Sequence, residues 1–145
     1  MGTAGSLRKI EFSNNLPILL TNGDVITEAN YMEMLNFHSE NNFDLTVAVK
    51  SSEWKNPYGV VQTDGIRVSD YIEKPVSTSL VNAGIYCLNQ SVINLIDADV
   101  QFDMSELILK CLGSNLSVGA FVLHENWLDI GRKEDFHRVE TLGDL

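Results

Sequence analysis

Two aspartates in this chain stand apart from the residues that build the scaffold. Asp24 ends the polar turn 22–24, directly after the apolar run 16–21. Asp129 lies among the apolar residues of the segment 127–131, where an unpaired buried carboxylate would be strongly unfavourable. Two carboxylates that converge on one crevice can hold Mg²⁺, which takes one or two carboxylates and completes its shell with substrate phosphates. The alternative for each is local: a turn residue at Asp24, and an N-cap or turn residue at Asp129.

Three smaller groups between the two aspartates carry suitable chemistry for a phosphorylated, hydroxyl-rich ligand. Gly59 begins an expected strand and leaves bare backbone against which a sugar could lie. Glu73 is suited to accept hydrogen bonds from paired hydroxyls, and the adjacent Lys74 meets a phosphate as a point charge. Asn82 offers a donor and an acceptor to hydroxyls. The alternatives are a solvated charge pair at residues 73 and 74, which adds little stability, and a turn role for Asn82.

These residues need elements to position them, and the pattern along the chain predicts alternating strands and helices. The expected strands are 16–21, 44–49, 58–63, 66–72, 80–88 and 117–123, and the expected helices are 4–10, 27–41, 90–96, 103–112 and 133–142. Thr27 is the expected N-cap of the second helix. Asp64-Gly65 is a strong signal for a hairpin turn, and Asp103 with Glu106 has the spacing of a capping box.

The fold class follows from the type and order of these elements. The continuous apolar run 16–21 indicates a strand covered on both faces, as in a parallel sheet. A strand, a helix and the strand 44–49 in close succession favour a right-handed crossover. In that helix Tyr31, Met34, Leu35 and His38 fall on one face and are expected to pack in the core. The prediction is therefore an α/β fold: a Rossmann-like, mainly parallel mixed sheet with helices on both faces, an antiparallel hairpin insertion, and one domain over 1–145.

Composition narrows the class of function. The 145 residues carry a formal net charge of −10, which argues against a nucleic-acid partner because nothing basic is concentrated enough to neutralise phosphates. No apolar run approaches the length of a membrane span, so no membrane partner is expected. Cys87 and Cys111 lie in apolar surroundings and are expected to be buried free thiols in a reducing cytoplasm.

Six motifs in order carry a family resemblance over nearly the whole chain. They are Gly2-Thr3-Ala4-Gly5, Asn22-Gly23-Asp24, Tyr58-Gly59-Val60-Val61, Glu73-Lys74-Pro75, Asn82-Ala83-Gly84-Ile85-Tyr86 and Trp127-Leu128-Asp129-Ile130-Gly131. Each motif alone is weak, but the ordered set resembles the sugar-phosphate nucleotidyltransferases. Within them it is most similar to the mannose-1-phosphate guanylyltransferase-like group.

The resemblance implies an activity and a role for each residue. The expected enzyme is a nucleotidyltransferase that joins a nucleoside triphosphate to a sugar 1-phosphate and releases an NDP-sugar and pyrophosphate, as in nucleotide-sugar biosynthesis. Asp24 and Asp129 would hold Mg²⁺, and Lys74 would contact the sugar phosphate. The remaining implied contacts are Gly2 and Thr3 with the base, and Gly59, Glu73 and Asn82 with the sugar.

One departure from the family pattern shapes the expectation for this chain. Members begin with a strand and a glycine-rich loop that clasps the triphosphate, whereas this sequence starts at the Gly-Thr-Ala-Gly segment. The chain is therefore expected to be the C-terminal portion of one nucleotidyltransferase domain, with little activity alone. A sheet edge left uncovered would favour homo-oligomers. The rival hypotheses are a non-catalytic regulatory or scaffold module and a generic α/β binding domain.

Overall fold

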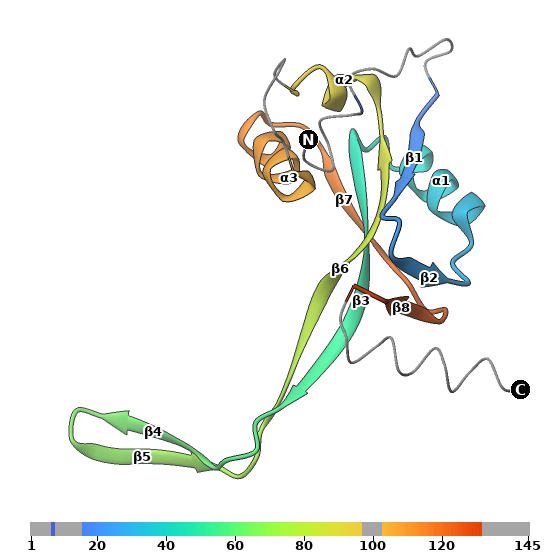
Figure 1. Cartoon of the computed structure of the whole chain (residues 1–145). Helices are drawn as coiled ribbons and strands as arrows, with labels where there is room; N and C mark the ends of the chain where they lie inside the picture. Colours follow the sequence, from blue (N-terminus) through green and yellow to red (C-terminus); the bar gives the residue numbers. More distant parts are fainter. Residues whose placement is uncertain (1–6, 8–15, 97–102, 132–145) are drawn as a thin grey trace, which may run out of the picture.

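The protein is represented by a computed structural model that describes residues 7, 16–96 and 103–131 (Figure 1). The strands are β1 (Ile18–Thr21), β2 (Val25–Thr27), β3 (Leu45–Lys55), β4 (Val60–Asp64), β5 (Arg67–Ile72), β6 (Val76–Leu88), β7 (Val118–Val122) and β8 (Trp127–Asp129). The helices are α1 (Tyr31–Glu40), α2 (Gln90–Ile93) and α3 (Met104–Gly113). The expected helices 4–10 and 133–142, and the predicted site residues Gly2 and Thr3, lie outside the described residues.

A mixed four-stranded sheet in the order β1-β6-β3-β7 forms the body of the protein. β6 pairs antiparallel with both β1 and β3, whereas β3 and β7 pair in parallel. β1, β3 and β7 therefore run in one direction, as a mainly parallel design requires. β1 and β3 are not neighbours, because β6 comes back between them. The prediction that the apolar run is a strand covered on both faces is confirmed, since Ile18 and Leu20 pack against one core cluster and Leu19 against another.

The two clusters lie on opposite faces of the sheet, and helices cover both. Leu45 and Val47 of β3 belong to the cluster that contains Leu107 of α3. Ala48 belongs to the second cluster, with Met34 of α1. Successive side chains of a strand point to opposite faces, so β3 divides its residues between the clusters. The α/β class with helices on both faces is confirmed.

Helix α1 begins later than predicted. Its N-cap is Asn30, whose side chain accepts hydrogen bonds from the backbone N–H groups of Met32 and Glu33. Thr27 instead ends β2, and its hydroxyl donates to the backbone oxygen of Asn126 at 2.9 Å. Thr27 was the wrong choice because that contact joins segments 99 residues apart and leaves no local trace. The capping box of α3 is confirmed, with the Asp103 N–H donating to Glu106 at 2.9 Å.

Beyond the body, β3 and β6 continue as a two-stranded ribbon that carries the β4–β5 hairpin (Figure 1). The ribbon runs from the pair Lys50–Val81 to the pair Lys55–Val76, so both strands are longer than predicted. The antiparallel hairpin itself is confirmed. Its closing pair is Asp64–Arg67, and Gly65 opens the two-residue loop with a φ of 58°, the conformation that a type II′ turn needs at this position.

In the part of the chain that the structure describes, no helix is long and apolar enough to cross a membrane.

Candidate active site

A small sheet of two strands brings the two aspartates together. β2 follows the turn that ends at Asp24, and it pairs antiparallel with β8, with Val25 opposite Asp129. The backbone N–H of Ile130 donates to the backbone oxygen of Asp24 at 2.9 Å, which extends the pairing by one residue. Asp24 and Asp129 are 105 positions apart in the sequence and adjacent in the fold.

Their carboxylates converge on Gly131. A methyl group at Gly131 would lie 2.8 Å from Oδ2 of Asp24 and 3.1 Å from Oδ1 of Asp129. The N–H of Gly131 also donates to Oδ1 of Asp129 at 3.0 Å, so Asp129 fills the turn role considered as its alternative as well. Asp24 is exposed and Asp129 is half-buried, which leaves both open to a ligand.

This pair fits the ligand preference of Mg²⁺. The ion usually binds one or two carboxylates and keeps the remaining positions for water and substrate phosphates. Within residues 7, 16–96 and 103–131, no group of three or more His, Cys, Asp or Glu side chains could hold a metal ion. A metal at Asp24 and Asp129 would therefore depend on substrate oxygens to complete its shell.

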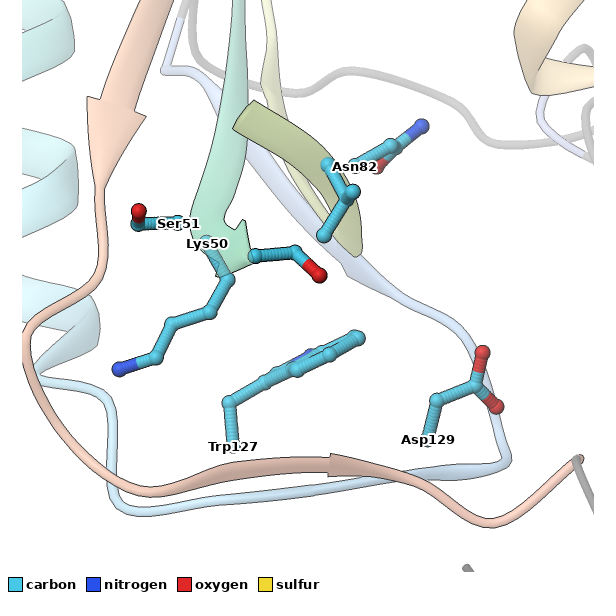
Figure 2. A pocket seen from close by; sticks show the side chains of 7 residues that line it. Lys50, Ser51, Asn82, Trp127 and Asp129 are labelled. Atoms are coloured by element: carbon cyan, nitrogen blue, oxygen red, sulfur yellow. The ribbon is translucent and has the colours of Figure 1, made fainter. Parts of the chain in front are cut away.

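A cleft of about 350 Å³ opens beside Asp129 (Figure 2). Its lining comes from the start of the ribbon and from β8: Lys50, Ser51, Ser52, Val81, Asn82, Trp127 and Asp129. Asn82, a predicted sugar contact, lines this cleft. Its Oδ1 accepts from the N–H of Gly84 at 2.9 Å, and its Nδ2 donates to the hydroxyl of Tyr86 at 3.0 Å. An amide has two donors and two acceptor sites, so the side chain keeps one of each for a ligand.

Two residues of the cleft were overlooked as site residues in the sequence. The indole of Trp127 forms one wall, and its N–H donates to the backbone oxygen of Ala83 at 2.8 Å, which fixes the ring (Figure 2). Lys50 also lines the cleft. Trp127 had a sequence signal, since it stands two residues before Asp129 and alternate residues of a strand share a face. For Lys50 the sequence contains no signal of a site role except its position at the polar end of an apolar strand.

The other predicted site residues lie at the far end of the ribbon. Five residue steps separate the pair Lys50–Val81 from the pair Lys55–Val76, which is roughly 16 Å along the strands. Gly59, Glu73 and Lys74 lie just beyond that second pair, in the connections to the hairpin. The structure therefore places Asp129 and Asn82 in one cleft and Asp24 next to Asp129, but it does not bring the hairpin residues to them.

At the hairpin, Tyr71 links two of the predicted residues. Its hydroxyl donates to the carboxylate of Glu73, and this hydrogen bond raises the pKa of Tyr71. The same hydroxyl occupies the space that a side chain at position 59 would need, so Tyr71 packs directly against the backbone of Gly59. Lys74 is exposed and has a φ of 45°, a strained value for a residue with a side chain.

With this geometry in view, comparisons with known proteins are informative. The family model described as nucleotidyl transferase matches residues 1–142. The mannose-1-phosphate guanyltransferase of Yarrowia lipolytica is 33% identical over 143 residues, which are 94% of this chain and 39% of that protein. A putative mannose-1-phosphate guanyltransferase of Sulfolobus acidocaldarius is 32% identical, over 96% of this chain and 39% of that protein. The chain thus spans about two fifths of the length of these curated relatives.

The fold of this chain is similar to that of several solved structures. The crystal structure of HddC from Yersinia pseudotuberculosis complexed with GMP-PN has a TM-score of 0.59 and 27% identity, over 94% of this chain and 60% of that chain. A putative glucose-1-phosphate thymidylyltransferase from Bacillus anthracis, in complex with a sucrose, has a TM-score of 0.65 and 18% identity, over 95% of this chain and 58% of that chain. The second likeness is evidence of a shared fold alone.

Proposed function

Since this chain belongs to the nucleotidyl transferase family, we propose that it forms the sugar-phosphate side of an enzyme that makes NDP-sugars from nucleoside triphosphates and sugar 1-phosphates. The favoured substrate pair is GTP and mannose 1-phosphate, because relatives at 31–33% identity carry the name mannose-1-phosphate guanyltransferase. The convergence of Asp24 and Asp129 at Gly131, beside a cleft, is the observation that carries this proposal.

The reaction needs positioning and charge neutralisation rather than a covalent protein intermediate. An oxygen of the sugar 1-phosphate attacks the α-phosphorus of the nucleoside triphosphate in line. The new O–P bond forms as the bond to the β-phosphate oxygen breaks, and pyrophosphate leaves with the electron pair. Mg²⁺ bound at Asp24 and Asp129 would supply positive charge to the phosphate oxygens, which matters in a chain with a net charge of −10.

The remaining residues are assigned to parts of the substrates, beginning with those that line the cleft. The free donor and acceptor of Asn82 suit sugar hydroxyls, and the fixed indole of Trp127 offers an apolar wall to a sugar ring. Glu73 and Gly59 are proposed sugar contacts, and Lys74 a contact to the sugar phosphate, once the ribbon approaches the cleft. Gly2 and Thr3 are proposed contacts to the base. The buried thiols Cys87 and Cys111 support a cytoplasmic setting.

The test is pyrophosphate release, in the presence of Mg²⁺, by a protein of the relatives' full length that contains this chain, because the chain alone is expected to have little activity. The assay covers GTP, UTP, dTTP, CTP and ATP, each with mannose, glucose and glucosamine 1-phosphates. We expect turnover with one pair, and a loss of at least 100-fold on Asp24→Asn, because that change removes a charged ligand of the metal. Asp64→Asn is the matched control, since it removes the same charge from the exposed hairpin tip.

A second candidate is a non-catalytic module that binds nucleotide or sugar phosphate without turnover. Binding without pyrophosphate release, unaffected by Asp24→Asn, would support that module and contradict the enzyme.

A further inference from the structure

Lys50 lies at the point where β7 leaves the sheet. The last contact between β7 and β3 is the hydrogen bond from the Leu123 N–H to the backbone oxygen of Val49, at 2.9 Å. The chain then turns and reaches β8 within four residues. Lys50 is the next residue of β3, and Figure 2 shows its ammonium directed toward this connection and away from Asp129.

The ammonium binds three successive backbone oxygens of that turn. Nζ of Lys50 donates to the carbonyl oxygens of Leu123 at 3.2 Å, His124 at 3.2 Å and Glu125 at 2.8 Å. A lysine ammonium has three N–H donors and no acceptor, so all three donors are used. Lys50 lines the cleft, but it has no donor left for a phosphate group. Its chemistry is therefore directed at the protein rather than at a ligand.

The three carbonyls need this cation. Successive carbonyls of an extended strand point in opposite directions, whereas those of residues 123–125 converge on one atom. Carbonyl dipoles that converge in this way repel one another unless a positive group lies between them. The bend from β7 to β8 thus needs a positive charge beside its carbonyl oxygens, and Lys50 supplies this charge from the neighbouring strand β3.

The bend determines where two cleft residues lie. Trp127 and Asp129 follow Glu125 by two and four residues, and both line the same cleft as Lys50. Other restraints on this part of the chain include the bond of the Trp127 indole to Ala83, the bonds of residues 27 and 28 to Asn126, and the β2–β8 pairing. A short two-stranded pairing is weak by itself, and of these restraints the clamp at residues 123–125 is the one that fixes the bend leading into β8.

We propose that Lys50 is a positioning residue: it clamps the turn 123–125 and thereby holds Trp127 and Asp129 in the geometry that the metal and the cleft require. The part concerning the metal rests on the proposed function of Asp24 and Asp129. The clamp itself rests only on the three hydrogen bonds of Lys50.

The first test measures Mn²⁺ binding to the full chain by electron paramagnetic resonance. Lys50→Met keeps the apolar stem and removes the ammonium. We expect its Kd for Mn²⁺ to rise about 10-fold or more, as for the loss of other groups that orient metal ligands. Lys55→Met is the matched control, because it removes the same charge from an exposed position of the same strand. Equal Kd values for the two variants would overturn the role at the metal.

The second test reports on the clamp without any metal. In a Trp54→Phe background Trp127 is the only tryptophan, and its fluorescence reports on the β8 side of the cleft. Lys50→Met should shift its emission to longer wavelength, and Lys55→Met should not. An unchanged emission in Lys50→Met would overturn the clamp. If the unaltered chain binds no Mn²⁺, the metal site of the proposed function fails while this test still decides on Lys50.

Chemical rescue separates a cation requirement from a simple loss of packing. Lys50→Ala leaves a space at the three carbonyls that methylammonium can enter, whereas Lys50→Met fills it. We expect methylammonium to restore the Trp127 emission of Lys50→Ala and to leave Lys50→Met unchanged. Restoration in both variants, or in neither, would contradict the clamp.

Discussion

Alanine at position 131 would place a methyl group between the two carboxylates of the candidate site. That methyl would lie 2.8 Å from Oδ2 of Asp24 and 3.1 Å from Oδ1 of Asp129. Both distances are shorter than an ordinary carbon–oxygen contact of about 3.3 Å, so at least one carboxylate has to move by a few tenths of an ångström. The φ of Gly131 does not lie in the left-handed region, so the backbone itself accepts alanine.

The effect on the metal should far exceed the effect on stability. Mg²⁺ demands near-ideal octahedral geometry at about 2.1 Å, and catalytic constellations tolerate displacements of only about 0.5 Å. We expect the Kd for Mn²⁺ to rise by about 10- to 100-fold, as for the loss of other groups that orient metal ligands. The exposed side chain of Asp24 can rotate away, so the free energy of unfolding should change by no more than about 0.5 kcal/mol.

The assay is Mn²⁺ binding by electron paramagnetic resonance, with urea unfolding on the same samples. Gly113→Ala is the control, because a methyl group there meets no other atom within 4 Å. Asp129→Asn marks the loss expected when a ligand is removed outright. Mn²⁺ binding by Gly131→Ala as tight as that of Gly113→Ala, with binding lost in Asp129→Asn, would refute the crowding argument.

Three further predictions concern stability and reactivity. Gly84→Ala should lower the free energy of unfolding by about 1–3 kcal/mol in urea, because Gly84 has a φ of 73° and a methyl there would lie 2.7 Å from Nδ2 of Asn22; no change would refute this. Hydrogen bonds from Ser91 and Ser117 lower the pKa of Asp44, so it stabilises the fold above the usual pKa of 3.8 and loses this effect as the pH falls through the lowered value. Asp44→Asn should therefore be less stable than the unaltered chain at pH 7, with a gap in melting temperature that narrows in acid, and a constant gap would contradict the assignment. Burial raises the pKa of Cys87 to about 11, so Ellman's reagent at pH 8 should leave this thiol unmodified until urea is added.

The sequence was informative wherever a structural cause acts over a few residues. The capping box at Asp103 and Glu106 and the hairpin around Gly65 depend on neighbouring residues, and both are present. The burial of Met34 and His38 followed from helical spacing, whereas Tyr31, which was expected on the same buried face, is exposed. The apolar runs marked Asp24 and Asp129 only as separate candidates, and their shared role at Mg²⁺ was implied by the family resemblance.

Features that depend on distant backbone could not be predicted in this way. β2 has three residues, too few to show a period, and its partner β8 lies about a hundred positions away. The three acceptors of Lys50 are backbone carbonyls, which every residue possesses and which therefore leave no signal in the sequence. The position of β6 between β1 and β3 could not be predicted either. The periodicity of apolar residues indicates that a segment is a strand, but it does not indicate which strands pair with it.

The β3–β6 ribbon amplifies a small bend at its base into a larger displacement of the hairpin at its far end. Its base, at Lys50 and Val81, is also a wall of the cleft, and its far end carries Glu73 and Lys74. Along a lever of roughly 16 Å, a bend of about 10° at the base moves the far end by about 3 Å, close to the length of one hydrogen bond. A small tilt at the base therefore displaces Lys74 by about this distance, while the residues at the base stay almost in place.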